Sequence, residues 1–146
     1  MNETVPLSAI PHRPPFLFID EVVEVDEVRI VTRWVADPRA PFFAGHYPGR
    51  PVVPGVLLCE CCFQAGALLL ATKFGGFDGA EGIPVVTRIR DARFRRMVLP
   101  GDALTVEVVL DDALDEAFDL TGRGSVGEEL AVRVSFACMR IKEQNP

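Results

Sequence analysis

A run of apolar residues between a proline and a glycine pair constrains the fold of this sequence most strongly. Pro54 suits the first turn of a helix, and Gly75-Gly76 supplies a stop after Phe74. A helix over 54–74 would be about 31 Å long. Its apolar side chains cover nearly every face: Val56, Leu57, Leu58, Phe63, Ala65, Leu68, Leu69 and Leu70. Because a helix that is apolar all round is a buried one, the rest of the chain must enclose it.

The same segment is not expected to cross a membrane. Glu60 and Gln64 interrupt it, and no apolar run reaches the ~18 residues that a span requires. Residues 1–4 lack the basic start of a signal peptide. With 146 residues, 49% of them hydrophobic and 25% charged, the chain has the size and composition of one folded domain, 1–146. We therefore predict a cytoplasmic protein without a membrane segment.

Alternating apolar and polar residues predict that a β-sheet encloses the helix. Strands are expected within Glu21–Val35, Leu104–Leu110, Phe118–Thr121 and Leu130–Cys138. Turns are expected at Asp111-Asp112 and within Gly122–Gly127. Strands this closely spaced pair antiparallel. The predicted class is α+β, with one long central helix wrapped by a curved antiparallel sheet.

Charge and cysteine usage restrict the partners of this chain. The net charge of −6 argues against nucleic-acid binding, although residues 29–96 carry ten basic and five acidic side chains and leave room for an anionic partner. Three of the four cysteines crowd into residues 59–62 and are expected to be small packing residues in a reducing compartment. No second pair or neighbouring histidine completes a metal site, so no metal is expected.

The segment before the helix holds the first candidate for chemistry. Residues 38–54 contain five prolines, which exclude a regular helix and predict a stiff, ordered loop. His46 lies in this loop, and Glu60 follows it 14 residues later, inside the predicted buried helix. A carboxyl group in an apolar helix is costly unless it is paired or protonated, so the two residues together indicate a site.

Helix geometry places further groups near Glu60. Helical side chains lean toward the N-terminus, so this carboxyl points back toward the unsatisfied first-turn amides of Gly55 and Val56. Gln64 lies one turn further along the same face and is placed to orient the carboxyl. An imidazole, a carboxyl group and amide donors together can perform proton transfer on a carbonyl compound.

Three motifs appear in the order of one known family. The most specific is residues 45–60, GHYPGRPVVPGVLLCE, followed by Gln64. The others are residues 10–17, IPHRPPFL, with Asp20, and residues 92–102, ARFRRMVLPGD. Together they resemble the FabZ family, the hot-dog-fold 3-hydroxyacyl-[acyl-carrier-protein] dehydratases. Glutamate at position 60, rather than aspartate, favours FabZ over the related dehydratase-isomerase FabA.

The resemblance implies a reaction that needs no cofactor. Water is removed from a (3R)-hydroxyacyl thioester on acyl carrier protein, which gives the trans-2-enoyl thioester. His46 would be the base that takes the C2 proton, and Glu60 would handle the leaving hydroxyl. The amides of Gly55 and Val56 would hold the thioester carbonyl. Phe63 adds bulk close to the site and is expected to shorten or reshape the acyl tunnel, which also allows a polyketide or aryl-polyene pathway.

The resemblance also implies partners. The family forms dimers in which two sheets join edge to edge and His46 of one subunit faces Glu60 of the other. We expect a homodimer here, or a trimer of dimers.

Five guanidinium groups lie within nine residues: Arg88, Arg90, Arg93, Arg95 and Arg96. Because acyl carrier proteins are acidic, these arginines are predicted to form a basic rim that steers the carrier to the tunnel mouth. The alternative is a solvated strand, with Arg88 and Arg90 on one face and Arg93 and Arg95 on the other unless a bulge intervenes.

Two other functions stay open from the residues alone. A hot-dog acyl-CoA thioesterase also uses a helix carboxylate and helix-terminal amides, but it does not need His46 in this setting. A non-catalytic acyl-binding protein is expected to have lost His46 or Glu60, and both are present. The second histidine, His12, is predicted to serve packing or subunit contact.

Overall fold

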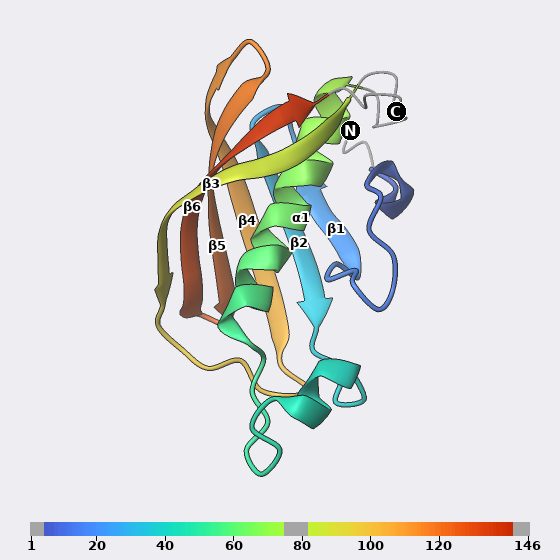
Figure 1. Cartoon of the computed structure of the whole chain (residues 1–146), viewed down its shortest axis with the longest axis vertical. Coiled ribbons are helices and arrows are strands. Elements are labelled where there is room, and N and C mark those ends of the chain that lie inside the picture. Colours follow the sequence, from blue (N-terminus) through green and yellow to red (C-terminus); the bar gives the residue numbers. More distant parts are fainter. Residues whose placement is uncertain (1–4, 75–81, 142–146) are drawn as a thin grey trace.

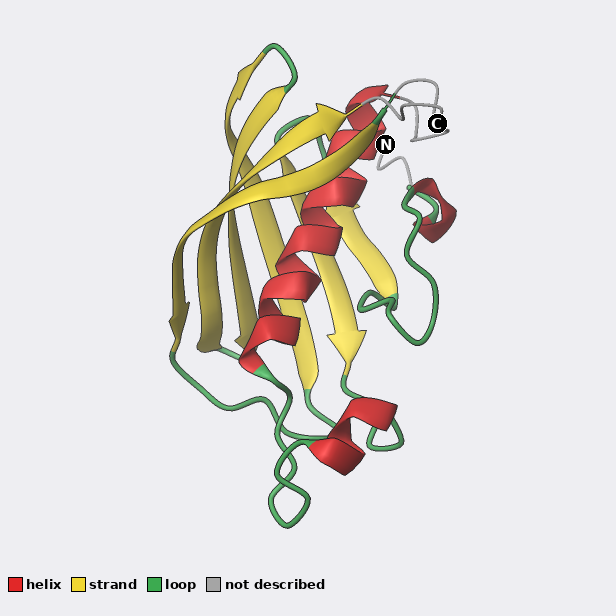
Figure 2. Cartoon of the chain, in the orientation of Figure 1, coloured by secondary structure: helices red, strands yellow, loops and turns green. Residues whose placement is uncertain are grey.

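The computed structural model describes residues 5–74 and 82–141, in which one long helix is wrapped by a six-stranded antiparallel sheet (Figure 1). The elements in chain order are η1 (Leu7–Ala9), β1 (Glu21–Val25), β2 (Arg29–Val35), η2 (Pro41–Gly45), α1 (Gly55–Phe74), β3 (Ile83–Phe94), β4 (Ala103–Leu114), β5 (Ala117–Val126) and β6 (Glu129–Ile141). The strand order is β1-β2-β4-β5-β6-β3, which leaves β1 and β3 at the edges. The predicted α+β class, with a central helix inside a curved sheet, is confirmed (Figure 2).

The core lies between α1 and the concave face of the sheet. Twelve of the 20 residues of α1 are buried. They meet inward-facing side chains that alternate along the strands, among them Leu104, Val106 and Val108 of β4 and Val132, Val134 and Phe136 of β6. The helix begins one residue after the predicted Pro54. The expected stop at Gly75-Gly76, like residues 1–4, lies outside the described residues.

The helix α1 is long and apolar enough, by length and composition, to span a membrane. Within the described residues, 67% of its most apolar 18-residue window is buried against the protein. It is therefore the core helix that its all-round apolar sequence predicts.

One predicted turn is wrong, and the other lies only at the last residue of its predicted range. Asp111-Asp112 does not reverse the chain, because a bulge between Leu110 and Asp112 absorbs the extra residue and β4 continues to Leu114. The reversal occurs at Asp115, whose φ is 55°.

Gly122 does not lie in a turn either, because β5 extends to Val126. A Cβ atom at Gly122 would lie 2.7 Å from Cβ of Cys62 on α1, so this glycine serves close approach of helix and sheet. Gly127 does form the β5–β6 turn, with φ 59°.

The N-terminal arm, residues 5–20, lies beside α1 (Figure 1). Its single helical turn in the described residues is η1, and Ile10, Phe18 and Ile19 are buried in the core. The loop between β2 and α1 is irregular apart from the short 3₁₀ helix η2, as its prolines require. Arm and loop thus both lie next to α1, where the candidate site residues are found.

Candidate active site

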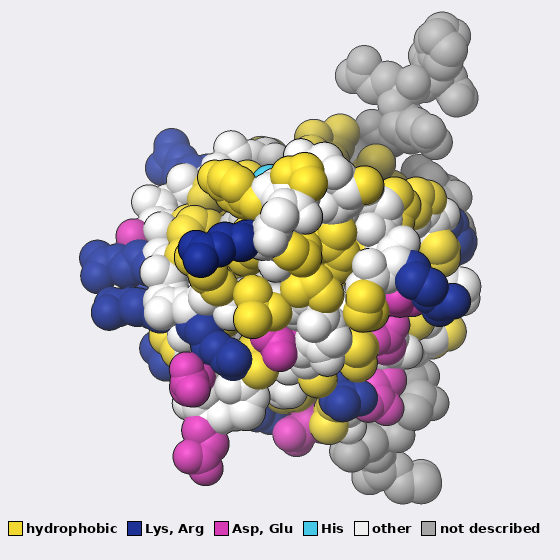
Figure 3. Space-filling model, turned by 90° about the horizontal axis from the view of Figure 1, so that it is seen from below, with side chains coloured by type: hydrophobic (Ala, Val, Ile, Leu, Met, Phe, Trp, Pro, Cys, Tyr) yellow, Lys and Arg dark blue, Asp and Glu magenta, His cyan; other side chains and the backbone are white. Residues whose placement is uncertain are grey.

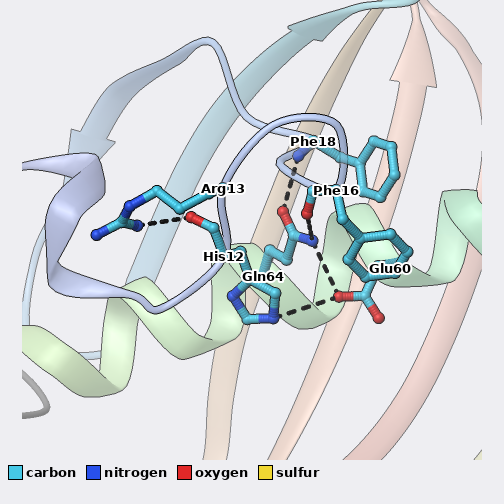
Figure 4. Close-up of polar contacts among 6 residues, drawn as sticks. All are labelled: His12, Arg13, Phe16, Phe18, Glu60 and Gln64. Atoms are coloured by element: carbon cyan, nitrogen blue, oxygen red, sulfur yellow. Dashed lines mark hydrogen bonds and ion pairs between the residues drawn. The ribbon is translucent and has the colours of Figure 1, made fainter. Parts of the chain in front are cut away.

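The carboxyl group of Glu60 lies on α1 beneath the N-terminal arm (Figure 4). Its side chain is only 21% exposed. Burial raises the pKa of Glu60 above its ordinary value, and the hydrogen bond from Gln64 opposes part of that rise. A carboxyl group in this setting holds a proton more tightly than one in water, which suits a general acid.

Gln64 joins the arm to the helix and holds Glu60. Its Nε2 donates to Oε2 of Glu60 at 3.0 Å and to the carbonyl oxygen of Phe16 at 2.9 Å. Its Oε1 accepts from the backbone N–H of Phe18 at 2.8 Å. The predicted contact between Gln64 and Glu60 is therefore present. Gln64 itself is fully buried, so its amide serves these contacts rather than an exposed binding surface.

His12 also faces Glu60, which the sequence interpretation missed. Its Nε2 lies 3.8 Å from Oε2 of Glu60, and its ring stacks on Phe16 with centroids 6.5 Å apart. Burial and the neighbouring Arg13 both lower the pKa of His12. The signal available in the sequence was a histidine and an arginine between prolines in an otherwise apolar arm. Their place over α1 depends on the path of the arm, which periodicity does not give.

His46 caps the C-terminal end of η2 and is half-buried. Its Nδ1 lies 2.9 Å from the carbonyl oxygen of Val52. Because a carbonyl oxygen only accepts, Nδ1 carries the proton in the neutral ring and Nε2 keeps a free lone pair. The next residue, Tyr47, has a positive φ of 51° and packs its ring 4.7 Å from the imidazole. The loop therefore fixes the ring in the tautomer that a general base at Nε2 needs.

The start of α1 offers the predicted amide donors. The N–H groups of Leu57 and Leu58 donate to the carbonyl oxygen of Pro54. The amides of Gly55 and Val56 lie in the first turn, where no helical carbonyl precedes them. Val56 is 74% exposed, and the Phe94 ring lies over Gly55, where a Cβ atom would be 3.1 Å from it. The helix N-terminus can therefore stabilise negative charge on an oxygen bound there.

Within the described part of one chain, no hydrogen bond or ion pair joins His46 to Glu60. Val52 and Tyr47 contact the histidine, whereas Gln64 and His12 contact the glutamate. The structure thus brings Glu60 together with Gln64 in one chain, and it keeps His46 in a separate set of contacts.

A family profile described as the FabA-like domain matches residues 10–134. The chain belongs to the FabA-like family. Curated relatives named 3-hydroxyacyl-[acyl-carrier-protein] dehydratase FabZ are similar to it. One from Verminephrobacter eiseniae is 37% identical over 133 residues, which cover 90% of this chain and 89% of the relative. One from Anaeromyxobacter sp. (strain K) is 38% identical over 131 residues, which cover 89% and 84%.

Solved structures share the fold of this FabA-like chain. The dehydratase heterocomplex ApeI:P from Xenorhabdus doucetiae has a TM-score of 0.81 at 16% identity, covering 97% of this chain and 94% of that one. A putative thioesterase from Ralstonia eutropha has a TM-score of 0.64 at 20% identity, covering 81% and 82%. The hot-dog fold is thus confirmed, but because both kinds of protein share it, the fold alone does not choose the reaction.

Phe63 of the FabA-like chain is half-buried on α1. Its ring packs edge-on against Phe136 of β6, with centroids 4.8 Å apart. Its bulk therefore lies between helix and sheet, one turn of the helix from Glu60.

The five arginines lie on or just after β3, the edge strand. Register shifts at Val86/Arg88 and Ile89/Asp91 interrupt its alternation, and Arg88, Arg90, Arg93 and Arg95 are all exposed.

Three of these arginines have acidic partners. Arg90 pairs with Asp119 at 2.7 Å, and Arg93 pairs with Asp91 at 3.3 Å. Arg96 lies within 4 Å of Asp102 and Glu129. Arg88 and Arg95 have no ion pair within the residues described, so they are the members of the cluster with charge to offer a partner.

Proposed function

We propose that this FabA-like chain removes water from (3R)-3-hydroxyacyl thioesters carried by acyl carrier protein and releases the trans-2-enoyl thioester. The observation that carries the proposal is the half-buried Glu60, held by Gln64 on the same helix that presents first-turn amides. The similarity of this chain to a FabZ dehydratase, 37% identity over 90% of its length, supports the same reaction.

The proposed reaction uses three groups. Nε2 of His46 removes the C2 proton, because its Nδ1–H is held by the Val52 carbonyl. Charge that develops on the thioester oxygen is stabilised by the amides of Gly55 and Val56 at the positive end of α1. Glu60 donates its proton to the hydroxyl at C3 as the C–O bond breaks and water leaves. The proton on His46 then returns through solvent to the Glu60 carboxylate.

The proposed site is shared between two subunits. In support, His46 and Glu60 have separate contacts in one chain. The edge strand β3 exposes Val85, Ile89 and Phe94, which a second sheet would cover. We therefore propose a homodimer joined along β3, with His46 of each subunit facing Glu60 of the other.

The proposed partner is an acidic acyl carrier protein. Figure 3 shows the end of the molecule that carries η2 and the start of α1, where apolar side chains gather in the middle and Lys and Arg lie around them, more of them on the left. Exposed apolar residues in the loop and first helical turn include Tyr47 and Val56. Arg88 and Arg95 supply charge that steers the carrier.

We also propose that residues 1–146 form a single catalytic domain that acts in the cytoplasm.

Thioester hydrolysis is the second candidate, since thioesterases share the fold. A thioesterase that used Glu60 as a base would need the carboxylate, whereas burial raises the pKa of Glu60 and favours the protonated form. One experiment separates the candidate functions. Purified protein is incubated with 3-hydroxybutyryl-acyl carrier protein and with acyl-CoA, and the products are identified by mass spectrometry. Loss of one water from the carrier-bound acyl group supports the dehydratase. Release of free acid would establish the thioesterase instead. If neither substrate changes, the protein is a non-catalytic acyl-binding protein.

A further inference from the structure

Two side chains converge on one oxygen of Glu60 (Figure 4). Gln64 donates to Oε2 at 3.0 Å, and Nε2 of His12 approaches the same Oε2 to 3.8 Å. The two neighbours come from different elements, one from α1 and one from the N-terminal arm. The arm is tied to the helix by the two backbone hydrogen bonds of Gln64, so His12 is carried on an anchored segment.

The surroundings of His12 select its tautomer. Its Nδ1 is buried and has no hydrogen-bond partner in the described part of the chain. Nδ1 is unpaired in either neutral tautomer, so the choice is made at Nε2, which faces an oxygen that already accepts a hydrogen bond from Gln64. The proton therefore belongs on Nε2, where the Glu60 carboxyl oxygen can accept it.

Burial and a neighbouring positive charge keep the ring of His12 neutral. Arg13, next to it on the arm, donates to the carbonyl oxygens of Ile10 and His12 at 2.7 and 2.6 Å, which fixes a positive charge nearby. From α1, the titratable groups are Glu60 and, beside it, the buried Cys59. Burial and Arg13 both lower the pKa of His12, so it faces Glu60 as a neutral donor.

We propose that His12 is a positioning residue that, together with Gln64, clamps Oε2 of Glu60 and leaves Oε1 to carry the proton that is transferred. The inference rests on the proposed role of Glu60. Once the His12 contact shortens to a hydrogen bond, Oε2 accepts from both neighbours, and the proton of the neutral carboxyl group then belongs on Oε1. At 3.8 Å the His12 contact is longer than a hydrogen bond, and catalytic hydrogen bonds commonly tighten when substrate binds.

Two variants distinguish the effect of the His12 N–H donor from the effect of its ring stacking. His12→Phe keeps the stacking on Phe16 but has no N–H, and His12→Gln supplies an N–H close to the position of Nε2. We expect His12→Phe to lower kcat about tenfold, the size of a lost hydrogen bond to the carboxylate that forms as Glu60 gives up its proton, with KM little changed. His12→Gln should recover most of kcat. Equal kcat in His12→Phe and wild type would overturn the proposal, and so would equal losses in both variants.

Two measurements do not depend on activity. In a ¹³C-carboxyl NMR titration, the Glu60 signal, assigned by its loss in Glu60→Gln, should titrate at higher pH in His12→Phe than in wild type and in His12→Gln. In ¹⁵N spectra of the two histidines, His46 should show the Nδ1–H tautomer and His12 the Nε2–H tautomer. An unshifted Glu60 titration, or Nδ1–H on His12, contradicts the clamp. Absence of dehydration by the wild type would refute the proposed function instead, and the NMR readouts would still decide the role of His12.

Discussion

The His46 side chain is held by a hydrogen bond to the Val52 carbonyl and by the ring of Tyr47, which leaves Nε2 to react. His46→Ala removes the proposed base but only one hydrogen bond, from Nδ1 to the Val52 carbonyl. General-base transfer commonly contributes about 10²- to 10⁴-fold, so turnover on a carrier-bound 3-hydroxyacyl substrate should fall by that range. The thermal unfolding midpoint checks that the fold is kept. A folded His46→Ala protein with near-normal turnover would contradict the assignment of His46 as the general base.

Glu60 should make stability depend on pH. Because burial raises its pKa above the ordinary 4.5, the folded state binds this proton more tightly than the unfolded state does. This group's contribution to stability is therefore highest below pH 4.5 and declines as pH rises through the raised folded value.

Glu60→Gln keeps the volume and an acceptor for Gln64 but cannot titrate. We expect a large loss of turnover, no such decline with pH, and stability at neutral pH equal to or above that of wild type. Urea unfolding across this pH range, together with kcat, tests both points. An active but less stable variant would make Glu60 a structural partner.

The close contact between α1 and β5 requires a glycine, Gly122, which has no side chain. In Gly122→Ala the new Cβ would lie 2.7 Å from Cβ of Cys62, so helix or sheet must move. Such overpacking costs about 1–3 kcal/mol of unfolding free energy. Gly49→Ala is the matched control, because nothing lies within 4 Å of its Cβ position. Equal stability of the two variants, measured by urea unfolding, would show that α1 is not tightly seated at this point.

The edge strand β3 offers a test of carrier recognition. Charge reversal at Arg88 and Arg95, which have no ion pair in the described residues, should raise KM for carrier-protein substrates. Turnover of a short pantetheine analogue should hardly change. Salt should weaken the difference, since exposed charges are screened over about 8–10 Å. Arg33→Glu on β2, which is separated from β3 by the three strands β4, β5 and β6, is the control. Equal losses on both substrates would place the arginines in packing or subunit contact.

Elements with a strong local signal could be predicted, and those set by tertiary contacts could not. The proline and apolar run placed the start of α1 to within one residue. The turn predictions failed at Asp111 and Gly122, because a bulge and a close helix contact use the residues that turns favour. The Gln64–Glu60 contact followed from helical spacing. The His12–Glu60 contact did not, because it depends on how the arm crosses α1.

At the scale of the whole molecule, the shared site predicts complementation between inactive subunits. His46→Ala and Glu60→Gln proteins are each expected to be nearly inactive. If subunits exchange freely, half of the dimers in an equal mixture are hybrids with one intact site of two. The mixture should therefore recover about a quarter of wild-type activity. Exchange is verified by native mass spectrometry with differently labelled subunits. Exchange without recovered activity would refute the shared site.

The enclosure of α1 also affects the unfinished protein. β1 and β2 precede the helix, but the four other strands that surround it leave the ribosome later. Until they do, the nascent chain displays a segment with the length and hydropathy of a membrane span. Glu60 and Lys73 are the only charged residues in that segment, and a carboxylate within a bilayer is costly. The side chain proposed to release water from the substrate therefore also disfavours insertion of the newly made chain into a lipid membrane.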